Sequence, residues 1–181
     1  MLKRDEYVRY QKKALEYIEK ANVVISNEEK EQISVNDFGL NDLANQGAEI
    51  LTFFNTDRIS CKIIVLLPGQ TLPEHWHPPM GDDPGKEEIM RVRLGEVYLY
   101  ISGESTENIK AKVPKKSAEY YTVYHQITMR PGEQVILNPG VIHWFQSGPE
   151  GAVIDDYSTC ARDVLDGFTD PNVKRITEIE E

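Results

Sequence analysis

Residues 67–77 read Leu-Pro-Gly-Gln-Thr-Leu-Pro-Glu-His-Trp-His, so a turn signal leads into a run that ends on two histidines. His75 and His77 occupy alternate positions, and in an extended chain both imidazoles point to the same face. Glu88 and His143 follow further along the chain. Imidazoles combined with a carboxylate form metal sites of nitrogen and oxygen ligands, so we expect a metal centre built on β-structure.

Glycine and proline stand at regular distances from these residues. Gly69 precedes His75 with five residues between them, and Glu88 precedes Gly95 with six. A second block reads Pro139-Gly140-Val141-Ile142-His143. The two blocks resemble the two sequence motifs of the cupins, which are small β-barrels that hold one metal in the barrel mouth.

From residue 48 onward, short apolar runs alternate with turn signals. The predicted strands are residues 50–54, 62–67, 96–101, 120–124, 134–137 and 152–154. The turn signals between them are Pro68-Gly69, Gly95, Ser102-Gly103, Pro131-Gly132, Pro139-Gly140 and Ser147-Gly148-Pro149. Many short strands with such punctuation indicate an all-β barrel or jelly roll. No long helix alternates with them, as a parallel α/β sheet would require.

The length of 181 residues fits one domain with a sizeable core. We therefore predict a mainly β protein, a single-domain cupin jelly-roll barrel with N-terminal helices. Residues 1–35 are expected to form a helical segment that packs on the barrel, residues 36–171 the barrel itself, and residues 172–181 a C-terminal tail.

Two helices are expected before the barrel. In residues 4–21, Val8, Leu15 and Ile18 can share one side of a helix. Ser26 and the acidic residues after it predict the start of a second, short helix over 27–33. These helices would form a lid or a dimer contact, or they would plug an open end of the barrel.

Composition narrows the possible partners. The net charge is −10 and the isoelectric point is near 4.9, which argues against binding nucleic acid or an anionic membrane surface. Residues 1–20 are charged throughout, so we expect no secretory signal peptide. Cys61 and Cys160 form neither a disulfide framework nor a CxxC motif. We therefore predict a cytoplasmic protein.

The ligand set is predicted to be His75, His77, His143 and a carboxylate. Glu87 competes with Glu88 for the last place, and the six-residue gap to Gly95 favours Glu88. These donors suit Mn²⁺, Fe²⁺, Co²⁺, Ni²⁺ or Zn²⁺. No cysteine stands near the motif, which disfavours a closed structural zinc site.

Two further residues are candidates for proton transfer. Lys86 stands two positions before Glu88, so in an extended segment both side chains face the site. Asp156 ends the strand that returns after His143, which would bring its carboxylate to the barrel mouth. Either residue is suited to general acid or base chemistry.

Beyond the cupin motifs, the chain resembles the D-lyxose isomerase family. The resemblance spans roughly residues 36–171 and rests on several blocks. These are Asn55-Thr56-Asp57-Arg58, Leu67-Pro68-Gly69-Gln70-Thr71, Pro73 to Pro79, Gly85-Lys86-Glu87-Glu88, Val97 to Tyr100, Tyr121-Thr122-Val123, Pro131 to Gln134, His143-Trp144-Phe145-Gln146, Gly151-Ala152-Val153 and Phe168-Thr169-Asp170-Pro171.

The resemblance implies a Mn²⁺-dependent enzyme that interconverts D-lyxose and D-xylulose, and often also D-mannose and D-fructose. It implies His75, His77, Glu88 and His143 as metal ligands and Lys86 as a proton donor. The family's catalytic glutamate aligns with Asp156, a carboxylate shorter by one methylene. Lys62 and Asp166 fall in matching stretches and are expected as sugar contacts.

Other functions remain open at this point. Another cupin group isomerises glucose 6-phosphate, which would require arginine and lysine near the mouth. A cupin dioxygenase with Fe²⁺ and a non-catalytic sugar-binding cupin are the further alternatives. In each case we expect a small-molecule ligand and a homodimer formed through sheet edges or N-terminal segments.

Overall fold

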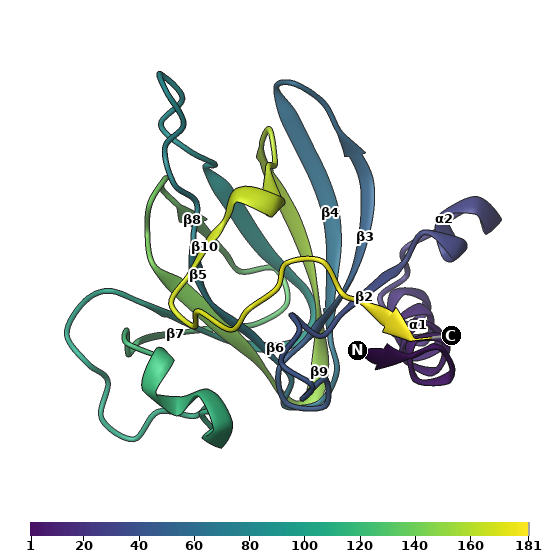
Figure 1. The fold of residues 1–181 in the computed structure, drawn as a ribbon, viewed down its shortest axis with the longest axis horizontal. Coiled ribbons are helices and arrows are strands. Elements are labelled where there is room, and N and C mark those ends of the chain that lie inside the picture. Colours follow the sequence, from purple (N-terminus) through teal and green to yellow (C-terminus); the bar gives the residue numbers. More distant parts are fainter. Residues whose placement is uncertain (181) are drawn as a thin grey trace.

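The computed structural model describes residues 1–180 and shows a strongly curled sheet with an N-terminal helix on its outside (Figure 1). The elements in chain order are β1 Leu2–Lys3, α1 Arg4–Lys20, α2 Asn27–Glu31, β2 Ser34–Asn36, β3 Ala48–Asn55, β4 Ile59–Leu66, β5 Thr71–Trp76, β6 Glu88–Ile101, the 3₁₀-helix η1 Lys115–Tyr120, β7 His125–Met129, β8 Gln134–Leu137, β9 His143–Thr159, the 3₁₀-helix η2 Asp163–Leu165, β10 Gly167–Phe168 and β11 Ile179–Glu180. The predicted mainly β architecture is confirmed. The proposed division at residues 35 and 171 stays a prediction.

The main sheet is antiparallel and is organised around two long strands. Its order is β10-β5-β9-β4-β3-β2, and β6 pairs with β7, β8 and β9. Strand β6 has 14 residues and β9 has 17. Because β9 pairs with β4, β5 and β6 along its length, the sheet bends around a common interior.

Two of the predicted turns lie inside these long strands, so the prediction of strand ends there was wrong. Gly95 lies within β6, and residues 147–149 lie within β9, where the pairing of the two strands shifts register. Gly95 has a φ of +78°, and a Cβ at this position would lie 2.0 Å from the backbone oxygen of Gly151. The glycine therefore permits a bulge and a corner in a continuous strand.

The predicted strand over residues 120–124 was also wrong. The 3₁₀-helix η1 occupies Lys115–Tyr120, and β7 begins at His125, just after the predicted stretch. The backbone N–H groups of Thr122 and Val123 donate to the buried carboxylate of Glu74. A backbone satisfied by a side chain in this way does not need a neighbouring strand.

The sheet separates two apolar cores because side chains alternate along each strand. The interior core includes Ile50, Ile64, Met90, Leu99, Phe145 and Ile154. The outer core lies between the sheet and α1 and includes Ile18, Leu51, Ile63, Val65 and Val153. Each fully buried aliphatic side chain contributes about 1.5–3 kcal/mol, so both cores hold the curled sheet in shape.

Helix α1 covers the outer face of the sheet and does not plug an open end of the barrel. Its buried stripe is Tyr10, Ala14 and Ile18, whereas Val8 is exposed, so the predicted stripe was right for Ile18 and wrong for Val8. The short helix α2 begins with a capping box between Ser26 and Glu29. Within residues 1–180, no helix is long and apolar enough to cross a membrane.

Candidate metal centre and active site

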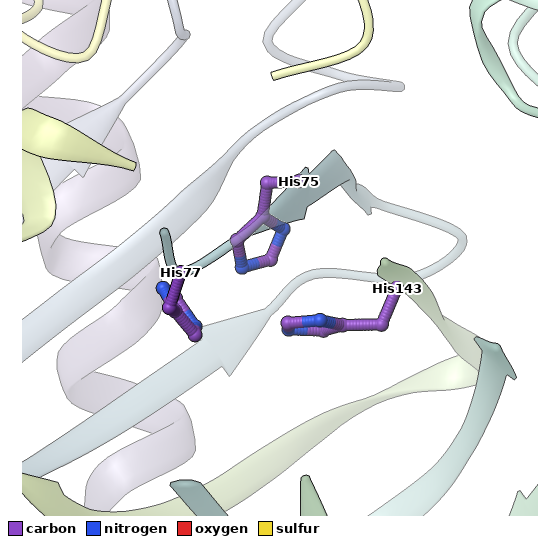
Figure 2. A group of neighbouring side chains, drawn as sticks. All are labelled: His75, His77 and His143. Atoms are coloured by element: carbon purple, nitrogen blue, oxygen red, sulfur yellow. The ribbon is translucent and has the colours of Figure 1, made fainter. Parts of the chain in front are cut away.

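Three histidines from two strands converge inside the curled sheet (Figure 2). His75 lies on β5 directly opposite His143 at the start of β9, and His77 follows the end of β5 on the same face. One ring nitrogen of each residue lies within 4.8 Å of the others, and all three side chains are buried. The alternation of His75 and His77, predicted from the sequence, therefore places both imidazoles toward His143.

Glu88 is the carboxylate that joins the three histidines. Its Oε2 lies 3.3 Å from Nε2 of His77 and 3.4 Å from Nε2 of His143. Glu87 is exposed, whereas Glu88 is buried, which decides between the two candidates on position. Burial raises the pKa of Glu88, but the Lys86 ammonium and the contacts with His143 and His77 hold it well below its usual range.

The other ring nitrogen of each histidine is bound to an acceptor. Nδ1 of His75 lies 2.9 Å from the oxygen of Pro73, and Nδ1 of His143 lies 2.8 Å from the oxygen of Val141. Nδ1 of His77 lies 2.6 Å from the carboxylate of Asp166. In His75 and His143, the acceptor at Nδ1 favours the tautomer that leaves Nε2 with a lone pair, as in metal-bound histidines. His77 has a carboxylate at each ring nitrogen; burial lowers its pKa, but the hydrogen bonds with Asp166 and Glu88 outweigh burial and raise it.

The donor set fits a divalent metal. Nε2 of His143 is buried and makes no hydrogen bond to any group in residues 1–180, although buried polar atoms are normally satisfied. Burial, with the neighbouring His143 and His77, lowers the pKa of His75 well below its usual value, which keeps its imidazole in the neutral form that binds metals. Three imidazoles and one carboxylate would hold Mn²⁺, Fe²⁺, Co²⁺, Ni²⁺ or Zn²⁺.

The two candidates for proton transfer line the same cavity as His75 and His77. Lys86 Nζ donates to Oε1 of Glu88 at 2.8 Å. Asp156 lies on β9 opposite Met90 of β6, and its buried Oδ1 has no hydrogen-bond partner within residues 1–180. Burial and the neighbouring Glu88 raise the pKa of Asp156 to about 8.

The two expected sugar contacts also line the cavity. Lys62 lies on β4 directly opposite Asp156, and Asp166 follows η2. Asp166 holds Nδ1 of His77, an interaction that the sequence did not indicate. The structure thus brings together every residue predicted for the site.

The cavity lining also includes residues that the sequence did not predict for the site. They are the apolar residues Phe38, Ile50, Ile64, Leu72, Phe145 and Phe168 and the charged residues Asp163 and Arg175. Phe168 stacks on the ring of His75 with centroids 5.7 Å apart. Arg175 lies in the stretch expected as a tail, which carries no sequence signal beyond its charge. Phe168 stands in one of the blocks that resemble the family, so for this residue a signal was present.

Comparison with known proteins decides the family. The model of the D-lyxose isomerase family matches residues 5–181. The chain belongs to the D-lyxose isomerase family. It is 51% identical to a D-lyxose/D-mannose isomerase of Thermosediminibacter oceani over 181 residues, which is the whole of both chains. It is 49% identical to a D-lyxose ketol-isomerase of Cohnella laeviribosi over 165 residues, or 91% of each chain.

Solved structures of similar shape confirm the cupin barrel of this family member. An L-ribose isomerase of Cellulomonas parahominis, solved with L-ribose, superimposes with a TM-score of 0.83 at 16% identity and covers 99% of this chain and 98% of that one. An L-ribose isomerase of Geodermatophilus obscurus gives a TM-score of 0.79 at 15% identity, with the same shares of each chain covered. At such identities the likeness concerns the fold. Because the chain belongs to this family and its close relatives are sugar isomerases, the chain is an aldose–ketose isomerase.

Proposed function

We propose that this protein is a metal-dependent D-lyxose ketol-isomerase that also converts D-mannose to D-fructose. The observation that carries the proposal is that His75, His77 and Glu88 line one cavity with Lys86 and Asp156, and that His143 joins the two histidines in one cluster. The close relatives named for D-lyxose and D-mannose support this choice of sugars. The two sugars differ by one hydroxymethyl group, so one cavity suits both.

The reaction needs one proton to move between two carbons. Asp156 would take the proton from C2 of the aldose, and its Oδ1, which has no hydrogen-bond partner within residues 1–180, would accept it. A C1–C2 double bond forms as that C–H bond breaks, and Asp156 then returns the proton to C1. General base catalysis by such a positioned group typically contributes about 10²–10⁴-fold.

A second proton must move between the two oxygens. Lys86 would protonate O1 as the double bond forms and would accept the proton of O2 as the ketone forms, so the net change is aldose to ketose. The hydrogen bond from Lys86 to Glu88 holds the ammonium in place for this step. A divalent metal held by the three histidines and Glu88 would act as a Lewis acid that stabilises the negative charge developing on the sugar oxygens.

An assay on D-lyxose, D-mannose and D-xylose tests the proposal, with the protein first stripped of metal and then given Mn²⁺. We expect turnover of lyxose and mannose that requires added metal. Replacing His77 by alanine should abolish both metal binding and turnover, and retained turnover would exclude this site. Asp156→Asn should bind metal as the wild type does and lose turnover. Full activity of that variant would assign the base to another residue.

Mn²⁺ as the native metal, a homodimer and a cytoplasmic location belong to the same proposal. Elemental analysis of protein purified from its own cells tests the metal. Gel filtration with light scattering tests the dimer, and cell fractionation tests the location.

A further inference from the structure

Lys62, Asp163 and Arg175 form a charged cluster in the wall of the cavity. Lys62 Nζ lies 2.5 Å from Oδ2 of Asp163, and Nη2 of Arg175 lies 3.2 Å from the same oxygen. The three residues come from β4, η2 and the segment between β10 and β11, and all three line the cavity. A single carboxylate oxygen therefore binds two cations that face the substrate space.

The cluster is shielded from solvent and held in place. The side chains of Lys62, Arg175 and Asp163 are 5%, 19% and 26% exposed. Burial raises the pKa of Asp163, but Lys62 and Arg175 outweigh burial and lower it, so the carboxylate stays ionised. Buried cations need such a partner, because a desolvated charge without one is costly.

Arg175 has two more contacts that fix its position. Its Nη1 donates to Oδ1 of Asn36 at 3.3 Å, and its guanidinium stands over the ring of Phe38 at 5.8 Å from the centroid. The guanidinium is thus ordered by the protein before any ligand binds, and so is the lysine beside it.

A lysine and an arginine side by side in a cavity are the groups that bind phosphate most strongly. In this protein the carboxylate of Asp163 already forms ion pairs with both Lys62 and Arg175. A phosphorylated sugar would have to displace that carboxylate or place its own negative charge beside it, and like charges repel strongly where water is excluded. The hydroxyls of an uncharged sugar can share hydrogen bonds with all three groups without displacing any of them.

We propose that Asp163 is a specificity-determining residue that occupies the Lys62–Arg175 pair and thereby excludes phosphorylated sugars from the cavity. The inference rests on the proposed function, because it concerns which sugars enter the same cavity. It does not involve the metal ligands or the residues that move protons.

Inorganic sulfate is a suitable probe, because it is a tetrahedral dianion that stays fully ionised at neutral pH. With the Mn²⁺-loaded protein and ionic strength held constant with chloride, we expect sulfate to be at most a weak competitor of D-lyxose for the wild type. Asp163→Asn should lower the inhibition constant of sulfate at least tenfold. Calorimetry should show the same gain in sulfate binding, so a protein without lyxose turnover would still test Asp163 separately from the isomerase proposal.

Two variants serve as controls. Asp83→Asn removes the same charge and frees Arg162, an exposed arginine that pairs with Asp83 outside the cluster, so it should bind sulfate no better than the wild type. Adding Arg175→Gln to Asp163→Asn should abolish the gain. If Asp163→Asn fails to fold, Asp163→Ser replaces it.

Strong competitive inhibition of the wild type by sulfate would overturn the proposal without any variant. An equal gain in sulfate binding in Asp83→Asn and Asp163→Asn would also overturn it, since the effect would then be one of overall charge.

Discussion

Replacing Glu49 by glutamine should remove a large pH dependence from the stability of this protein. Glu49 lies on β3 in the outer core under α1, and its side chain is fully buried. Its Oε1 accepts a hydrogen bond from Nε2 of Gln70 at 3.2 Å. Its Oε2 has no partner within residues 1–180. Burial raises the pKa of this carboxyl from 4.5 to about 8.

The sign and size of the effect follow from this pKa. Below pH 4.5 the carboxyl is protonated in the folded and the unfolded chain alike. Between pH 4.5 and about 8 the unfolded chain releases the proton while the folded chain retains it, so stability falls as the pH rises. One pKa unit corresponds to about 1.4 kcal/mol, and the interval from 4.5 to about 8 therefore corresponds to a loss of about 5 kcal/mol.

Urea unfolding of the wild type and of Glu49→Gln at pH 4.5 and pH 8.5 measures this loss. The free-energy difference between the two proteins should change by about 4 kcal/mol between these pH values in favour of the glutamine variant, since both end points lie within the titration range. Any fixed cost of the buried amide is present at both pH values and cancels in that change. Glu19→Gln, which makes the same substitution on the exposed side of α1, is the matched control and should follow the wild type. Parallel pH profiles of Glu49→Gln and the wild type would refute the reasoning.

Three further predictions concern a strand corner, the core and the metal centre. Gly95→Ala should lower the unfolding free energy by several kcal/mol in urea melts, because its positive φ and the 2.0 Å approach to a backbone oxygen leave no room for a Cβ. Trp144→Ala should cost about 3–5 kcal/mol in the same assay, since the side chain is fully buried and stacked on Tyr100. Asp166→Asn should weaken metal binding about 10–100-fold in a competition titration, because the carboxylate orients His77; unchanged affinity would contradict that role.

The candidate metal ligands could be predicted from the sequence because they stand in two motifs that resemble those of the cupins, and the strand geometry of the histidines agrees with those motifs. Alternation places His75 and His77 on one face, and a direct cross-strand pairing brings His143 opposite His75. Lys62 and Asp156 meet by the same kind of pairing. Where register alone fixes a neighbour, the period of two along a strand is sufficient information.

The strand boundaries were less predictable for a physical reason. Glycine and proline mark a local change of backbone direction, but they do not show whether the hydrogen-bonded ladder stops there. At Gly95 the ladder continues through a bulge, because the strands on both sides of the corner still bury apolar side chains. At Thr122 the ladder is absent although the residues favour strands, because Glu74 takes the backbone N–H groups. Tertiary contacts override local propensity in both places.

The charged cluster of Lys62, Asp163 and Arg175 could not be predicted from the alternation of side chains along a strand or from the pairing of strands. Lys62 and Asp163 are 101 positions apart in the sequence, and Arg175 reaches them from a segment between two strands of two residues each. Only the folded chain brings these charges together. The ion pairs of Asp163 are with Lys62 and Arg175, and neither of these is a candidate metal ligand. Substitutions of Asp163 or Arg175 should therefore change the relative KM values of different sugars while leaving metal affinity as it is. Such a separation would let the sugar preference of this protein change while its metal centre stays the same.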